Sequence, residues 1–267
     1  MNSWVSPDGV TIGYDDEGIG DALVLVHGHP FNRSMWRPQV DRFSRDGWRV
    51  IAPDLRGYGE STVVPGMTTL DVFARDIAGL LDHLGVGTIV LGGLSMGGQI
   101  VMDFYRQFPD RVRGLLLADT FAAGETEEGR RRRNAIADRL LREGMAGYAD
   151  EELPKMMAPH NIEALPAVAE QVLGMMRTTP PEGAAAALRG RAERPDYVEL
   201  LAKIAVPALV VVGREDTYTP VADGELLHNH LPDSRLVIVE GAAHLPNLER
   251  EIEFNEALLA FLSGLSG

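Results

Sequence analysis

One serine lies among four glycines in the stretch GGLSMGG, residues 92–98. Gly93, Ser95 and Gly97 form the pattern G-x-S-x-G between an apolar run and a segment with helical periodicity. A strand that turns this sharply into a helix needs glycine near the serine, because a side chain there would collide with the neighbouring backbone. The turn exposes the serine hydroxyl. The pattern therefore predicts a nucleophilic serine at position 95; a flexible turn that merely contains a serine is the weaker alternative.

A serine hydroxyl becomes a good nucleophile when a base takes its proton and a third group orients that base. Asp216 follows the apolar run ALVVVG, and His244 follows RLVIVEG, the last such run along the chain. Ser95, Asp216, His244 is the chain order expected for a nucleophile on a strand-to-helix turn. Asp119, which ends the run RGLLLAD, is the competing acid. Asp216 is favoured because its position fits that order directly.

A tetrahedral intermediate also needs hydrogen-bond donors for its negative oxygen. The backbone N–H of Met96, the residue after the nucleophile, is the first predicted donor of this oxyanion hole. The loop HGHPF (27–31) follows another apolar run, and it predicts the backbone N–H of His29 as the second donor. We expect His27 to be a structural hydrogen-bonding residue beneath this loop.

Short apolar runs rich in Val, Leu and Ile recur along the chain, each bounded by Gly, Pro or Asp, which is typical of strands buried on both faces. They cover residues 22–28, 48–54, 88–93, 113–119, 208–213 and 235–241. Helical periodicity lies between them, as in 69–85, 96–109 and 247–264. Strands that alternate with helices predict an α/β fold with a mostly parallel sheet covered on both faces. The N-terminal stretch WVSPDGVTIGYDDEG predicts antiparallel strands at one edge.

The alternation stops between about residues 121 and 206, where the sequence forms helices readily and shows no convincing strand. We predict a helical insertion that lies over the sheet, so that residues 1–120 and 196–267 form the core domain and residues 121–195 form a cap. Five methionines of the insertion are expected mainly to pack its interior. They are Met145, Met156, Met157, Met175 and Met176.

The composition excludes several classes of protein. The chain has no cysteine, so disulfides, thiolate metal sites and a cysteine nucleophile are excluded. The net charge of −14 argues against a nucleic-acid partner. No apolar run is long enough to span a bilayer and no secretory signal is recognisable, which predicts a cytoplasmic protein without a membrane partner. We interpret the basic run Arg130–Arg133 as a solvated helix face paired with Glu127 and Glu128, with an anion-attracting rim as the alternative.

These motifs together resemble the α/β-hydrolase superfamily over essentially the whole chain. The resemblance is carried by HGHP, PDLRGYGES, GGLSMGG, FPDRVRGLLLAD, VPALVVVGREDTYTP and GAAHLPNLE. It implies an α/β-hydrolase fold with an eight-stranded sheet and a helical cap, and a serine hydrolase that needs no metal or organic cofactor. Within the superfamily the chain looks most like small bacterial esterases and lactonases, including the 3-oxoadipate enol-lactonase and haloperoxidase-type groups. Ser95 excludes epoxide hydrolases and haloalkane dehalogenases, which need an aspartate nucleophile.

We therefore predict hydrolysis of a carboxylic ester or lactone of a small to medium molecule through an acyl-enzyme on Ser95. His244 is the predicted general base, and Asp216 orients it. C–C bond hydrolysis and perhydrolase or haloperoxidase-type chemistry use the same triad and stay open, and a non-catalytic small-molecule binder is the remaining alternative. The oligomeric state is not determined by the sequence, and a homodimer stays open. The residues predicted to contact the substrate are Phe31, Phe121, Met145 and Leu245.

Overall fold

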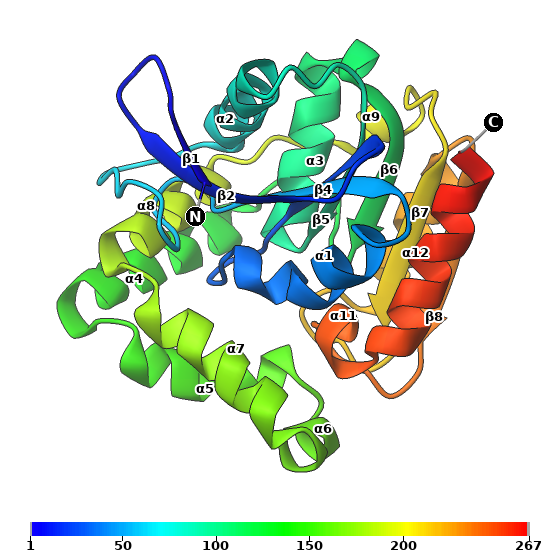
Figure 1. The fold of residues 1–267 in the computed structure, drawn as a ribbon. Coiled ribbons are helices and arrows are strands. Elements are labelled where there is room, and N and C mark those ends of the chain that lie inside the picture. The colour runs from blue at the N-terminus through cyan, green and yellow to red at the C-terminus, as the bar shows by residue number, and fades with distance from the viewer. Residues whose placement is uncertain (1, 266–267) are drawn as a thin grey trace.

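An eight-stranded sheet crosses the centre of the computed structural model, which describes residues 2–265 (Figure 1). The strand order is β1-β2-β4-β3-β5-β6-β7-β8. β1 and β2 pair antiparallel at one edge, and the strands from β4 to β8 are parallel. The strands are β1 (Asn2–Val5), β2 (Thr11–Glu17), β3 (Asp21–Val26), β4 (Trp48–Pro53), β5 (Ile89–Leu94), β6 (Val112–Ala118), β7 (Ala208–Gly213) and β8 (Ser234–Val239). The predicted α/β-hydrolase sheet and its antiparallel edge are thus confirmed.

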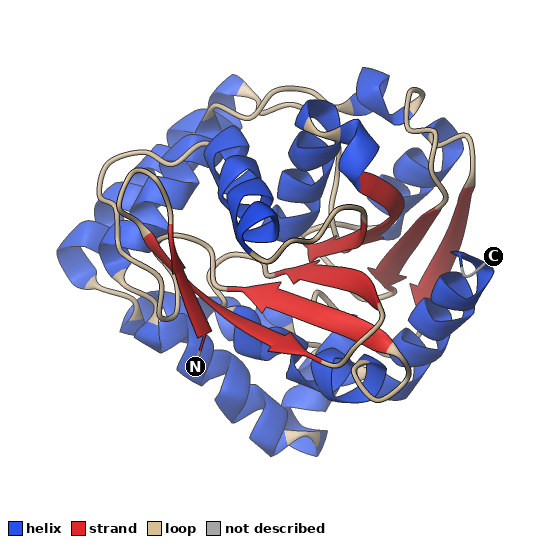
Figure 2. Cartoon of the chain, turned by 45° about the horizontal axis from the view of Figure 1, so that its top comes forward, coloured by secondary structure: helices blue, strands red, loops and turns tan. Residues whose placement is uncertain are grey.

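Helices cover both faces of this sheet (Figure 2). Along β3, Leu23 and Leu25 pack in one hydrophobic cluster, whereas Val24 and Val26 pack in the other, as expected when successive side chains of a strand point to opposite faces. One cluster includes residues from α2 (Leu70–His83), α3 (Met96–Gln107), α9 (Val198–Leu201) and α10 (Val221–His230). The other includes residues from α1 (Arg37–Phe43), α11 (Pro246–Glu249) and α12 (Glu251–Leu265), together with η1 (Arg33–Trp36). A second short 3-10 helix, η2 (Pro109–Arg111), precedes β6.

The predicted helix 247–264 is two helices. The backbone at Arg250 has φ −136° and ψ 59°, which lies outside the helical region and separates α11 from α12. Hydrophobic periodicity did not reveal this break, because the apolar residues of both helices face the same cluster.

The insertion between β6 and β7 carries six helices, of which the first five gather beside the sheet (Figure 1). These five are α4 (Glu127–Glu143), α5 (Ala146–Met156), α6 (Pro159–Ala164), α7 (Pro166–Thr178) and α8 (Pro181–Ala192). These helices lie inside the predicted cap, residues 121–195. The following α9 packs through Leu201 in the core cluster, so the part of the insertion nearest β7 belongs with the sheet.

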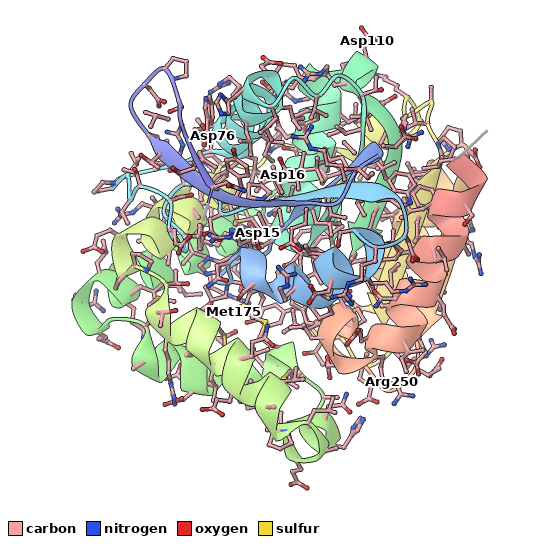
Figure 3. All side chains as sticks on the ribbon, in the orientation of Figure 1. Asp15, Asp16, Asp76, Asp110, Met175 and Arg250 are labelled. Atoms are coloured by element: carbon pink, nitrogen blue, oxygen red, sulfur yellow. The ribbon has the colours of Figure 1, made fainter. Side chains whose placement is uncertain are left out.

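The cap is docked on the core by its own backbone as well as by side chains. Gly183 of α8 lies so close to Gly57 that a Cβ atom at position 183 would be 1.9 Å from the Gly57 carbonyl oxygen. The Thr68 N–H also donates to the Ala186 carbonyl at 3.0 Å. Met175 of α7, labelled in Figure 3, packs in the same cluster as Trp36 of the core. All five methionines of the insertion are buried. Met145 packs inside the insertion, as expected, whereas the other four pack in the cluster that includes residues of the sheet.

Within residues 2–265, no helix has the length and apolar character that crossing a membrane would require.

Candidate active site

The turn at Ser95 has the geometry that its glycines predict. Ser95 joins β5 to α3 with φ 59° and ψ −117°, a conformation that non-glycine residues rarely adopt. A Cβ atom at Gly93 would lie 2.3 Å from the Gly97 carbonyl carbon, and one at Gly97 would lie 2.2 Å from the Val26 oxygen. Neither position has room for a methyl group. The two glycines therefore permit a strained turn at the carboxyl end of β5, and Ser95 on this turn lines a cavity.

His244 and Asp216 form the predicted base and acid pair. His244 Nδ1 donates to Asp216 Oδ2 at 2.7 Å, and both side chains are buried. The Asp216 carboxylate also accepts the backbone N–H of Tyr218 at 2.7 Å and the Thr219 hydroxyl. With Nδ1 bound to the carboxylate, Nε2 is the imidazole nitrogen left to take a proton from a nucleophile. His244 and Ser95 line the same cavity, so the fold brings the three predicted residues to one place.

The competing acid, Asp119, lies next to this pair rather than in it. Asp119 Oδ1 accepts the Gly213 N–H at 2.8 Å, and Oδ2 is buried without a partner. Oxygen and nitrogen atoms of Asp119, Asp216 and His244 lie within 4.8 Å of one another. Burial, and then the charge of Asp216, hold the pKa of Asp119 well above its ordinary value. Asp119 therefore keeps its proton to a higher pH than an ordinary aspartic acid, beside the carboxylate of Asp216.

Asp119, Asp216 and His244 are also the one group of described residues close enough together to hold a metal ion. The 2.7 Å bond between His244 Nδ1 and Asp216 Oδ2 already engages one possible ligand atom from each of two of these residues. The arrangement fits proton transfer better than metal binding.

A buried glutamate that the sequence analysis did not identify holds the histidine loop. Glu249 Oε1 accepts the backbone N–H of Ala243 at 2.9 Å. Its other oxygen accepts the N–H of Ala158 at 2.7 Å and the Asn161 side-chain amide at 2.8 Å, both from the cap. Glu249 thus joins the loop before His244 to the cap. Its position five residues after His244 was the only sequence signal, and that spacing does not predict the direction of its side chain.

The HGHP loop, residues 27–30, lies against the nucleophile. A Cβ atom at Gly28 would lie 3.2 Å from Ser95 Cβ, so the loop needs glycine to approach this closely. The bond between His29 and Pro30 is cis. His27 is buried, and its Nε2 accepts the Leu55 N–H at 3.0 Å, which is the structural role expected for it.

The two predicted oxyanion donors flank the serine. As the first residue of α3, Met96 has a backbone N–H without an intrahelical partner. His29 lines the same cavity as Ser95, from the loop that follows β3. These positions are compatible with an oxyanion hole made of the two backbone N–H groups.

A cavity of about 630 Å³ lies between the triad and the cap. Phe121 lines it as expected, but Phe31, Met145 and Leu245 do not, which corrects the sequence prediction. Phe31 and Leu245 are buried in the core, and Met145 packs between the cap helices. Nearness to the oxyanion loop or to His244 along the chain did not determine where these side chains point. The other cap residues in the cavity wall are Glu125, Gly129, Arg132, Arg133, Ile136, Tyr148, Glu152, Lys155, Met156, Leu188 and Arg191.

Comparison with known proteins agrees with this geometry. Residues 21–251 match the family model described as alpha/beta hydrolase fold. The chain is an alpha/beta hydrolase. Its relatives include 3-oxoadipate enol-lactonase 2 of Acinetobacter baylyi, 31% identical over 256 residues that cover 95% of this chain and 93% of the relative. A 2-hydroxy-6-oxononadienedioate/2-hydroxy-6-oxononatrienedioate hydrolase of Burkholderia vietnamiensis is 32% identical, with 93% of this chain and 90% of the relative covered.

Among solved structures, this alpha/beta hydrolase is similar to a thermophilic esterase of Thermogutta terrifontis in a malate-bound form. The TM-score is 0.95 and the identity 39%, with 99% of this chain and 97% of the other covered. The names of these proteins are those of an enol-lactonase, a hydrolase and an esterase, in agreement with the predicted class of enzyme. A non-heme chloroperoxidase of Kitasatospora aureofaciens, 29% identical, is also among the relatives.

Proposed function

We propose that this alpha/beta hydrolase cleaves carboxylic esters or lactones of small to medium size, with Ser95 as nucleophile. The observation that carries the proposal is the 2.7 Å bond between His244 Nδ1 and Asp216 Oδ2, with Ser95 on a strained turn in the same cavity. The esterase and enol-lactonase names of its relatives support the same chemistry.

In the first half of the reaction, Ser95 Oγ attacks the carbonyl carbon while His244 Nε2 takes its proton. The backbone N–H groups of His29 and Met96 stabilise the negative oxygen of the tetrahedral intermediate. His244 then gives its proton to the leaving alcohol, and the acyl group stays on Ser95. In a lactone, the leaving alcohol remains attached to the acyl group.

In the second half, a water molecule gives a proton to His244 and attacks the acyl carbon. The acid product leaves, and Ser95 recovers its proton. Throughout, Asp216 holds the imidazole with Nε2 toward the serine and stabilises its charged form. The cycle uses no metal or organic cofactor. The cap and core division, the cytoplasmic location, and a small-molecule substrate without a nucleic-acid or membrane partner remain part of this proposal.

A panel of methyl and p-nitrophenyl esters of graded acyl length, with lactones of graded ring size, tests the proposal. The native protein should turn over members of the panel, and Ser95→Ala should lose that turnover. Absence of turnover across the panel, or equal turnover by Ser95→Ala, would contradict it. Turnover restricted to vinylogous diketones would favour C–C hydrolysis, which the name of the Burkholderia relative indicates for that protein.

A further inference from the structure

The wall of the active-site cavity is rich in cations, although the protein carries a net charge of −14. Its cations are Arg132, Arg133, Arg191 and Lys155. Arg133 pairs with Glu125, and Lys155 pairs with Glu152. Arg132 and Arg191 form no ion pair with any residue in the range 2–265. The cavity therefore has an excess of positive charge, one part at its exposed rim on α4 and one part buried on α8.

Arg191 is a buried cation that lacks a counter-ion. Its exposed fraction is 7%, and its Nε donates to the Gln99 side-chain oxygen at 3.2 Å. Burial, then the charges of Arg133 and Arg194, hold the pKa of Arg191 well below its ordinary value. An uncompensated buried charge is costly, so such a side chain is kept where something neutralises it.

Arg194, only three residues further along, shows how a neighbouring buried arginine is accommodated. Arg194 pairs with Glu125 at 3.5 Å, and its guanidinium stacks 4.6 Å from the centre of the Phe121 ring. It also donates to the Ala123 carbonyl at 3.1 Å. The protein thus supplies Arg194 with partners and leaves Arg191, which faces the cavity, with one neutral acceptor.

Two neutral donors near Arg191 also lack partners. Gln99 Nε2 is buried without a hydrogen bond, because the amide oxygen is turned to Arg191. His29 Nε2 is buried without one in the cavity wall. The Tyr58 hydroxyl, whose pKa is raised by burial, lies 2.8 Å from His29 Nδ1. Burial, then Arg191, hold the pKa of His29 well below its ordinary value, which favours the neutral ring. When the Tyr58 hydroxyl donates to Nδ1, the hydrogen of that ring is on Nε2.

One acceptor is also free in this wall. The second oxygen of Glu152 is buried without a partner, but Glu152 is neutralised by Lys155 at 2.6 Å. The charge that remains uncompensated is positive.

We propose that this cavity binds the carboxylate of an anionic substrate against Arg191, which Gln99 positions from behind the cavity wall, with the His29 side chain as a further donor. The inference rests on the proposed function and specifies its substrate class: an ester or lactone that also carries a carboxylate. Arg191 is bonded to Gln99, which lies one helical turn after Ser95, and His29 belongs to the oxyanion loop. The carboxylate is therefore close to the reacting carbonyl, which favours short dicarboxylic half-esters. Arg132 at the rim adds long-range attraction for anions.

Hydrolysis of two matched series tests the proposal. One series holds monomethyl esters of dicarboxylic acids with four to eight carbons, and the other holds methyl esters of monocarboxylic acids of the same lengths. The ratio of kcat/KM between the two series measures the preference for a carboxylated substrate. A change in catalytic rate that affects both series equally leaves this ratio unchanged. The native enzyme should favour the carboxylated series, most strongly at the short end.

Arg191→Met should lower this ratio by about 30-fold, because the desolvated charge that meets the carboxylate is lost. Arg191→Lys should recover part of it. The matched control is Arg189→Gln, since Arg189 lies on the same helix but pairs with Asp138 at 2.7 Å on the surface. An unchanged ratio in Arg191→Met, or a native preference for the neutral series, would overturn the proposal. Failure of both series to react would instead count against the proposed function.

Binding without catalysis gives an independent measurement. Glutarate should raise the melting temperature of Ser95→Ala more than neutral glutaramide at the same concentration, since a ligand that binds only the folded state stabilises it. Equal shifts would overturn the proposal, and this comparison needs no substitution at Arg191. In Ser95→Ala/Arg191→Met the advantage of glutarate should disappear, and its persistence would place the anion elsewhere.

Discussion

The active-site cavity has two walls of different origin. The core wall comes from the loops that follow β3, β5, β7 and β8, and its reactive groups are tied to protein partners: His244 to Asp216, and Asp216 to Thr219. The cap wall comes from α4, α5 and α8 and the segment before α4, and it includes Arg132 and Arg191, which form no ion pair among residues 2–265. Groups that do the chemistry must be held in place, whereas groups that select a substrate must keep bonding capacity for it. The difference indicates that the core determines the reaction and the cap determines the substrate.

The two walls are joined at a few defined contacts. Glu249 bonds the histidine loop to Ala158 and Asn161 of the cap. Gly183 and Gly57 join the other end of the cap to the core through close backbone contact. Substitutions in the core, in the cap and at these contacts should therefore differ in kind as well as in size.

The largest effect is expected in the core wall. Ser95→Ala should lower kcat on every ester by roughly four to six orders of magnitude, because no other nucleophile replaces the serine. Single-turnover and steady-state assays on carboxylated and neutral esters measure this loss. A loss of activity confined to one class of substrate would contradict the inference that the core wall determines the reaction and the cap wall determines the substrate.

The two buried acids should differ strongly in activity. Asp216→Asn should lower kcat by about 10³- to 10⁴-fold, because the asparagine would favour the wrong imidazole tautomer. Asp119→Asn is the matched control: the raised pKa of Asp119 favours its neutral form, and asparagine keeps the acceptor for the Gly213 N–H. Steady-state kinetics on one neutral ester compares them. Equal losses would show that both acids act on the histidine.

At the junction of the walls, Glu249→Gln should lower kcat by about tenfold and the free energy of unfolding by about 2 kcal/mol. The reason is that charge-assisted bonds to Ala243, Ala158 and Asn161 become neutral or are lost. Glu253→Gln, which breaks an exposed pair with Arg250, should change little. Kinetics and urea unfolding measure both. Equal changes in kcat and in the free energy of unfolding for the two variants would contradict the inference that Glu249 joins the core to the cap.

Cap docking should show in stability more than in chemistry. Gly183→Ala should lower the free energy of unfolding by about 1–3 kcal/mol, because its methyl group would collide with Gly57. Gly174, also in a cap helix, has open space around it, so Gly174→Ala should raise stability by up to about 1 kcal/mol. Urea unfolding distinguishes the two. A harmless Gly183→Ala would mean that the cap does not depend on this contact.

The smallest effect is a pH dependence of stability. The pKa of folded Asp119 is raised, so the stability that its proton provides is complete below its unfolded pKa and is lost as pH rises toward the folded pKa. Asp119→Asn does not titrate. Its free energy of unfolding, relative to the native protein, should therefore increase between acidic and neutral pH. Urea unfolding across that range measures the difference, and a constant difference would show that Asp119 is not protonated in the fold.

The contrast between the walls also explains what the sequence could predict. Carboxyl ends of neighbouring parallel strands meet at one edge, so the positions of Ser95, Asp216 and His244 after their strands were enough to place them together. Cap residues depend on how helices pack against one another, which periodicity does not determine. The expectation for Met145 was therefore wrong. Sequence also could not show that Arg191 has no ion-pair partner among residues 2–265, because that depends on which acids lie near it in the folded chain.

Fluorophosphonate labelling of the native protein, followed by peptide mass mapping, tests the central claim most directly. One adduct should form, on the peptide that contains Ser95, in parallel with loss of esterase activity. Labelling should be slow in Asp216→Asn and absent in Ser95→Ala. A label on another residue, or full activity in a fully labelled protein, would contradict a nucleophilic serine at the end of β5.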